Sequence, residues 1–192
     1  MRSWNYWADN AKEDEPVDIE HYTAIGGIEH ALSIHADQVY KDLPSDRSRE
    51  VAEVLFKSLT DKGADNREIR RPTTIGNIKD VSESSLSEIL TVVEAFRAPR
   101  CSFITTPGEG QELTVDSIID ISHESLMRNW TTLTKRVREE SESASIYRRL
   151  SETAALLKEG KADYSRDPEL TIQLNWRKEN RPNAAWAKRY AN

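Results

Sequence analysis

Hydrophobic residues recur every three or four positions through the first third of the chain, which is the spacing of amphipathic helices. The first stretch predicts a helix over residues 28–43, which Pro44 ends. Ser45 and Asp46 form the start signal of a second predicted helix over residues 46–60. The positions that share one face are Ile28, Leu32, His35, Val39 and Leu43 in the first helix, and Val51, Val54, Leu55 and Leu59 in the second.

The centre of the chain mixes short helical patterns with alternating ones. The expected elements, in chain order, are a short strand at 69–72, helices at 73–79 and 84–96, and strands at 101–105 and 113–121. Pairs of Thr or Ser begin both helices and are expected to cap them. A Pro-Gly-Glu-Gly turn at 107–110 joins the last two strands. The order helix, strand, helix, helix, hairpin is that of a winged-helix domain, with the hairpin as its wing.

From residue 122 onward the pattern is helical again. Residues 139–143 are expected to form a break or a solvated face, and one stripe is expected from Leu126, Trp130, Leu133 and Val137. Gly160 ends one long helical stretch, Asp167-Pro168 begins a helix over 169–179, and residues 181–183 open a last short one. Residues 3–11 also carry tryptophans at helical spacing. The expected fold class is therefore mainly α (α+β). The expected domains are the end of a helical domain with a linking helix at 1–43, a winged helix at 44–122 and a C-terminal helical extension at 123–192.

Composition narrows the classes of function. The 192 residues carry a net charge of −6, which argues against general affinity for nucleic acid or an anionic membrane. No apolar run approaches the ~18 residues of a membrane helix. Helix 84–96 occupies the place of a DNA-reading helix, yet its only charged residues are Glu88 and Glu94. Cys101 is the single cysteine, so no disulfide framework is expected and a cytoplasmic location is the default.

The sequence shows no recognisable catalytic set. It contains no phosphate-binding loop, no His-Glu-x-x-His and no Gly-x-Ser-x-Gly pattern. His30 and His35 are five residues apart, which is off the spacing that places two side chains on one helix face. We therefore expect neither a catalytic centre nor a metal site in this chain.

One candidate remains, at the junction where the alternating segment 113–121 passes into a helical pattern. His123 places an imidazole there, where free backbone N–H groups could meet an anionic group. Glu124 would lie in the first turn of the helix and suit its dipole. The residue pattern alone favours a histidine that merely caps or packs at a helix start.

Three blocks of sequence together resemble a known family. They read YTAIGGIEHAL at 22–32, ISHESLMRNW at 121–130, and YRRL at 147–150 followed by WR at 176–177 and PNAAW at 182–186. Their order and spacing resemble the region downstream of the NTPase core in bacterial STAND ATPases. The resemblance is to the novel STAND group, which is often fused to WD repeats or similar sensor arrays, and it covers nearly the whole chain.

The resemblance implies a signalling ATPase in which a P-loop core precedes a helical domain, a winged helix and further helices. The core is absent here, so we expect either an excised fragment or a core on another polypeptide. ADP or ATP with Mg²⁺ would bind in that core, and this chain alone would hold no cofactor and catalyse no reaction. Its expected partners are the core and the sensor repeats, in cis or in trans, with oligomerisation on activation.

The resemblance also implies a role for the junction. In plant resistance proteins and NOD-like receptors, a winged-helix histidine in a Met-His-Asp-Leu context contacts the β-phosphate of ADP and holds the closed state. The run from His123 to Leu126 is similar in residue types and in position. His123 would sense the nucleotide, Ser122 would cap the helix, and Glu124 and Arg128 would support them. The alternatives are a DNA-binding winged-helix regulator and a protein-interaction scaffold.

Overall fold

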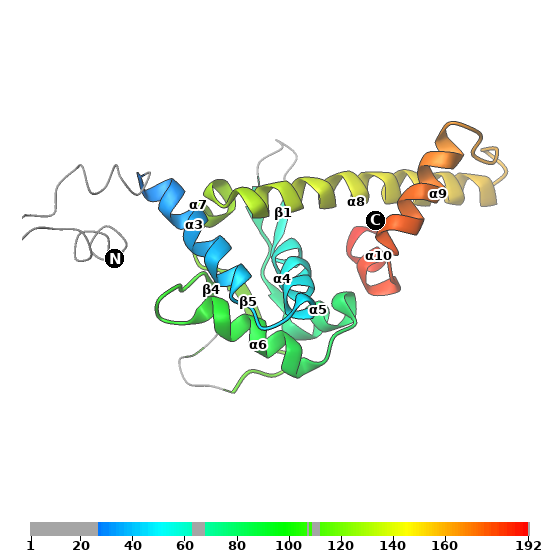
Figure 1. The fold of residues 1–192 in the computed structure, drawn as a ribbon. Coiled ribbons are helices and arrows are strands. Elements are labelled where there is room, and N and C mark those ends of the chain that lie inside the picture. The colour runs from blue at the N-terminus through cyan, green and yellow to red at the C-terminus, as the bar shows by residue number, and fades with distance from the viewer. Residues whose placement is uncertain (1–26, 63–67, 107, 109–111, 192) are drawn as a thin grey trace, which may run out of the picture.

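The computed structural model describes residues 27–62, 68–106, 108 and 112–191. The helix expected at 3–11 and the beginning of the block at 22–32 lie outside these residues. The described chain is mostly helical, with two small antiparallel sheets (Figure 1). Its helices are α3 (Gly27–Lys41), α4 (Asp46–Ser58), α5 (Ile75–Ser82), α6 (Leu86–Arg97), α7 (Glu124–Asn129), α8 (Thr131–Lys158), α9 (Glu169–Asn180) and α10 (Ala184–Tyr190).

The strands are β1 (Thr60–Lys62), β2 (Glu68–Arg70), β3 (Thr73–Thr74), β4 (Ile104–Thr105) and β5 (Ile118–Ile121). The strands β1 and β2 form a two-stranded sheet, and a three-stranded sheet has the order β3-β5-β4. In the second sheet Thr73 pairs with Ile119, and Ile104 pairs with Ile121. The expected antiparallel pairing of the last two strands is therefore present, although the strand β1 was not predicted from the sequence.

Hydroxyl side chains begin the central helices as the sequence predicts. Ser45 accepts a hydrogen bond from the Ser48 N–H at 3.1 Å, and Thr74 accepts one from the Asn77 N–H at 3.2 Å. Ser85 forms a reciprocal capping box with Glu88 at the start of α6. Each cap satisfies backbone N–H groups that have no partner within the helix, so these boundaries are set by nearby sequence.

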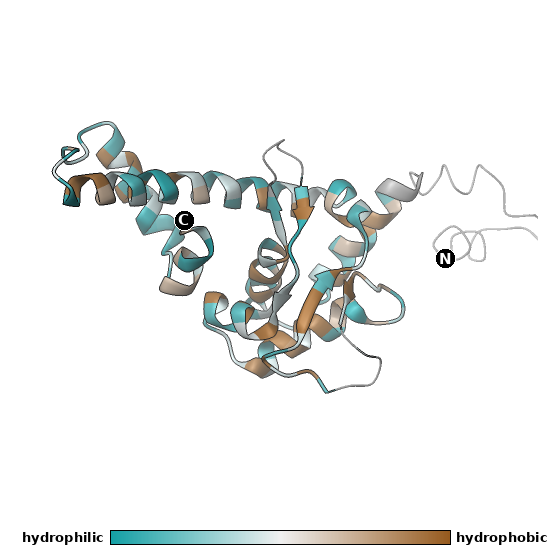
Figure 2. Cartoon of the chain, turned by 180° about the vertical axis from the view of Figure 1, so that it is seen from behind, coloured by the Kyte–Doolittle hydropathy of each residue, from teal (hydrophilic) through white to brown (hydrophobic). Residues whose placement is uncertain are grey.

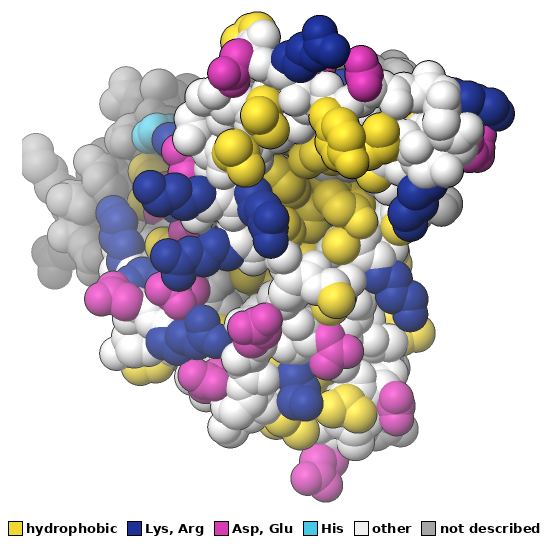
Figure 3. Space-filling view, turned by 90° about the vertical axis from the view of Figure 1, so that its right-hand side faces the viewer, with side chains coloured by type: hydrophobic (Ala, Val, Ile, Leu, Met, Phe, Trp, Pro, Cys, Tyr) yellow, Lys and Arg dark blue, Asp and Glu magenta, His cyan; other side chains and the backbone are white. Residues whose placement is uncertain are grey.

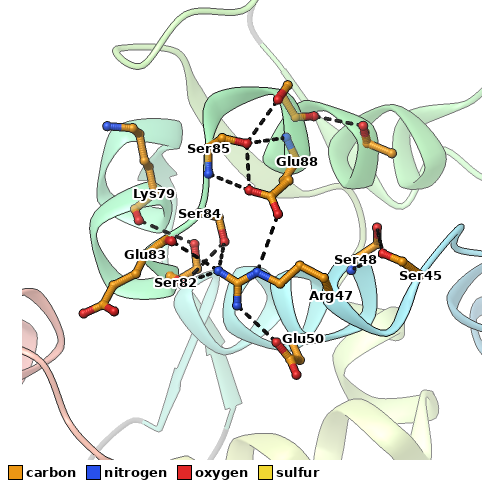
Figure 4. A network of polar contacts seen from close by, with 12 residues as sticks. Ser45, Arg47, Ser48, Glu50, Lys79, Ser82, Glu83, Ser84, Ser85 and Glu88 are labelled. Atoms are coloured by element: carbon orange, nitrogen blue, oxygen red, sulfur yellow. Dashed lines mark hydrogen bonds and ion pairs between the residues drawn. The ribbon is translucent and has the colours of Figure 1, made fainter.

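Arg47 connects the start of α4 to the turn between α5 and α6 (Figure 4). Its guanidinium donates to the carbonyl oxygens of Ser82 and Glu83 and to the Ser84 hydroxyl, at 2.9 to 3.2 Å. It also lies 3.6 Å from the carboxylate of Glu88. A cation at the carboxyl end of α5 complements the helix dipole, and the network ties the start of α4 to the turn between α5 and α6.

The core lies between α4, α5, α6 and the three-stranded sheet, where hydrophobic residues are concentrated (Figure 2). The rings of Phe56, Phe96 and Trp130 meet at its centre. The Phe56 centroid lies 4.8 Å from that of Phe96 and 4.8 Å from that of Trp130. The predicted stripe Leu126, Trp130, Leu133 and Val137 is buried in this core.

The strand expected over 113–121 is shorter than predicted, because its first half has another partner. The carbonyl oxygen of Val115 accepts a hydrogen bond from the Gly76 N–H at 2.7 Å, and that of Ser117 accepts one from the Ile75 N–H at 3.0 Å. These carbonyls satisfy the free N–H groups at the start of α5. A Cβ at Gly76 would lie 3.1 Å from the Val115 oxygen, so this approach favours glycine.

The helical pattern after residue 122 is interrupted at Trp130, which ends α7 and precedes α8 in an extended conformation. The Trp130 indole N–H donates to Asp37 on α3 at 2.6 Å, and the Thr132 hydroxyl donates to the same oxygen at 2.8 Å. Residues 139–143, an expected break or solvated face, continue α8 without interruption. A contact across 93 residues of sequence thus produces the break.

The helix α8 has 28 residues and extends beyond the core, and its far half carries α9 and α10 (Figure 1). Tyr147, Trp176, Trp186 and Tyr190 pack their rings against one another there, with neighbouring centroids 4.8 to 6.4 Å apart. In the described ranges no helix is both long and apolar enough to span a membrane.

Candidate functional site beside helix α7

His123 stands between β5 and α7 with an exposed side chain. It occupies the N-cap position of α7, and its ring makes no capping hydrogen bond. The helix that follows has only six residues, whereas the sequence suggested a long one. The dipole of so short a helix is small, so an anion near His123 would depend mainly on the imidazole itself.

Ser122 does not cap the helix as expected. Its hydroxyl donates to the carbonyl oxygen of Ser102 at 2.5 Å, and its backbone N–H donates to the carbonyl oxygen of Phe103 at 3.0 Å. Both bonds extend the pairing between β5 and the segment before β4. Ser122 therefore anchors the backbone that carries His123, and this assignment replaces its predicted capping role.

Glu124 and Arg128 lie on one face of α7, four residues apart. Their side chains form an ion pair at 3.6 Å and remain 62% and 75% exposed, so the pair contributes little to stability. Both line an open groove of about 490 Å³ together with Arg70 and Asp120, which form a second ion pair at 3.2 Å. His123 does not line this groove.

The charge balance of the groove does not by itself favour a phosphate. Glu68, Asp120 and Glu124 supply three carboxylates, against the guanidinium groups of Arg70 and Arg128. Both guanidinium groups are paired with a carboxylate of the groove. The chemistry available around His123 is thus one exposed hydrogen-bonding imidazole beside a paired, mixed-charge surface.

The sequence did not indicate a contact between His35 and Cys101, which are 66 residues apart. The Cys101 sulfur lies 3.7 Å from Nε2 of His35, and the His35 ring packs edge-on against Phe103. Burial raises the pKa of the Cys101 thiol, which keeps it protonated and a poor nucleophile. The contact ties α3 to the segment before β4. Among the described residues no group of three or more His, Cys, Asp or Glu could hold a metal ion.

Comparison with known proteins identifies the family. Residues 3–165 match the family model described as novel STAND NTPase 1, and this range includes both the core around α4–α6 and the whole of α8. No curated protein and no solved structure matches the chain. Because the match spans most of the sequence, the chain belongs to the novel STAND NTPase 1 family.

Proposed function

We propose that this chain is a regulatory winged-helix and helical module of a STAND signalling ATPase. In this proposal it closes over ADP and Mg²⁺ bound in an adjacent P-loop core and holds the protein in its inactive state. His123 contacts the nucleotide phosphate, and the module moves away when sensor repeats detect their ligand, which permits oligomerisation. Catalysis belongs to the core.

The order of elements supports the winged-helix assignment. The helices α4, α5 and α6 pack together, and β3 enters the sheet between α4 and α5 in sequence. The strands β4 and β5 follow as an antiparallel pair, with β5 in the centre of the sheet. His123 lies between β5 and α7 with an exposed side chain, so a neighbouring domain could reach it.

The exposure of His123 is the observation that carries the nucleotide role. The His123 side chain is exposed and makes no capping hydrogen bond, so the ring is accessible to a partner. The backbone on its N-terminal side is fixed by the Ser122 bonds to residues 102 and 103. An exposed donor on a fixed backbone suits contact with a phosphate group of another domain.

The DNA-binding alternative has little support from α6. The residues Ile89, Val92, Val93 and Phe96 turn inward, and the exposed positions carry Ser87, Thr91 and Glu94. Phosphate contacts require Lys or Arg on the outer face, and α6 has only Arg97, whose guanidinium pairs with Glu94 at 2.7 Å. The experiment below distinguishes the nucleotide role from that of a protein-interaction scaffold.

The experiment replaces His123 with Leu in the protein that contains the NTPase core. The purified protein is denatured and its ADP is quantified by ion-exchange chromatography. The bound ADP should fall, because the affinity for ADP should drop about tenfold. This corresponds to the loss of one charge-assisted hydrogen bond of about 1.4 kcal/mol. His30→Leu, at an exposed position of α3, is the matched control. Equal ADP content in all three proteins would refute the nucleotide role and favour the scaffold.

A further inference from the structure

A second, smaller cavity lies where α10 meets α4 and α8. Its volume is about 160 Å³, and it shares no lining residue with the groove beside α7. Its walls come from α4, the end of α5, α8, the link between α9 and α10, and α10 itself. Elements that are distant in sequence thus converge on this cavity. A ligand bound here would be a function additional to the one proposed above.

The cavity carries an excess of positive charge. Lys57, Arg181 and Arg189 line it, against the single carboxylate of Glu140. That carboxylate is already engaged, because it accepts hydrogen bonds from the Trp186 indole at 2.6 Å and the Tyr190 hydroxyl at 2.9 Å. Lys57 is its closest cation, at 3.6 Å, so most of the positive charge is left uncompensated.

Several hydrogen-bond donors in the wall of the cavity lack a carboxylate or another acceptor in the described chain. Within the described ranges Arg181 and Arg189 have no carboxylate within ion-pairing distance, although Arg189 donates to the carbonyl oxygens of Lys57 and Thr60 at the end of α4. The Nε of Arg189 is buried and has no hydrogen-bond partner among the described residues. Buried polar groups normally have partners, so an unpaired guanidinium N–H in the wall of a cationic cavity indicates a missing acceptor.

The remaining walls are apolar. Val54, Val81, Pro182 and Trp186 supply them, and Trp186 adds the face of an aromatic ring. The volume is close to the ~150 Å³ cavity that holds one benzene molecule, so the cavity suits a ligand of only a few heavy atoms. A compact oxyanion with a small apolar body would satisfy both the donors and these walls.

We propose that this cavity binds a small oxyanion, held by Lys57, Arg181 and Arg189, with its body against Trp186. The bound anion bridges α4 to the link between α9 and α10. Binding therefore holds α10 in place, since a ligand that binds only the docked arrangement stabilises that arrangement. The C-terminal helices appear at the right of Figure 1, and the face that carries them is hollowed and lined in part by hydrophobic side chains (Figure 3).

The test follows the Trp186 indole N–H in ¹H–¹⁵N spectra of the full chain, with the resonance assigned by Trp186→Phe. Sodium isobutyrate and inorganic phosphate are titrated separately, and sodium chloride is the control for ionic strength. We expect a saturable shift with at least one oxyanion and none with chloride. Tighter binding of isobutyrate would identify an organic carboxylate, and tighter binding of phosphate an inorganic anion.

Lys57→Gln and Arg181→Gln test the assignment of residues, and each should weaken binding about tenfold. Arg149→Gln, an exposed arginine of α8 outside the cavity, should leave binding unchanged. Arg189 is left intact because its bonds to the end of α4 also stabilise the fold. Either the absence of a shift with both oxyanions or unchanged affinity in both Gln variants would overturn the proposal.

Discussion

A hydrogen bond from a tyrosine hydroxyl to a glutamate occurs in both halves of the molecule, the core around α4–α6 and the C-terminal helices. Its surroundings differ between the two. Around the core, the Tyr40 hydroxyl donates to Glu53 at 3.0 Å, and Arg136 pairs with the same carboxylate at 2.5 Å. In the C-terminal helices, the Tyr190 hydroxyl donates to Glu140 at 2.9 Å. The first contact lies beside a large apolar core, and the second joins helices that bury few aliphatic side chains.

This difference indicates how each half is stabilised. Residues such as Leu55, Ile78 and Phe96 are fully buried, so burial of apolar surface dominates the first half. In α9 only Gln173 and Trp176 are buried, whereas Leu170, Ile172 and Leu174 are exposed. The C-terminal half therefore depends on stacked rings and on hydrogen bonds to a few polar groups, and it should open more easily.

The largest expected effect tests the core. Phe96→Ala removes a fully buried ring that contacts Phe56 and Trp130 and leaves a cavity. The free energy of unfolding should fall by about 3–5 kcal/mol, as measured by urea denaturation. A loss below about 1 kcal/mol would show that the core repacks and would weaken the contrast between the halves.

The next effect tests the C-terminal half. Glu140→Gln replaces the carboxylate that accepts from Trp186 and Tyr190, and it should cost about 1.5–3 kcal/mol. The loss should be local, because α10 opens while α4–α6 stay folded. Hydrogen exchange should accelerate in α10 and remain unchanged in α6; equal acceleration in both helices would mean that the two halves unfold together.

The contact between Tyr40 and Glu53 predicts a dependence on alkaline pH. Burial, and then the hydrogen bond and charge of Glu53, raise the pKa of Tyr40 from 10.0 to about 12. The folded state thus holds the proton more tightly than the unfolded state, so this contribution is fully present below pH 10 and is lost as the pH rises toward 12. Tyr40→Phe should lose less stability than the parent between pH 10 and pH 12 in urea titrations. An identical pH dependence of the two proteins would contradict this.

The smallest effect concerns the surface of the candidate site. Arg128→Ala removes one partner of an exposed pair on α7, and the free energy of unfolding should change by less than about 0.5 kcal/mol. Thermal denaturation of Arg128→Ala and Phe96→Ala under the same conditions would compare the two losses of stability directly. A larger loss would reveal that the groove beside α7 contributes to the fold.

The candidate site was located in sequence, but its geometry was not predicted. The pattern placed His123 after a strand, and the structure places it there with an exposed side chain. Ser122 was misassigned because its acceptor, the Ser102 carbonyl, is 20 residues away. The cavity at α10 gave no sequence signal, since its lining residues are spread from Val54 to Arg189.

By itself, the sequence determined what nearby residues control. The helix starts at Ser45, Thr74, Ser85 and Asn183 rest on side chains that accept hydrogen bonds within one turn. Only the tertiary structure decided the break at Trp130 and the short length of β5. Asp37 holds the Trp130 indole from another helix, and the start of α5 takes the carbonyl oxygens of residues 115 and 117. Local caps act within the chain segment that carries them, whereas these partners become available only when distant elements pack together.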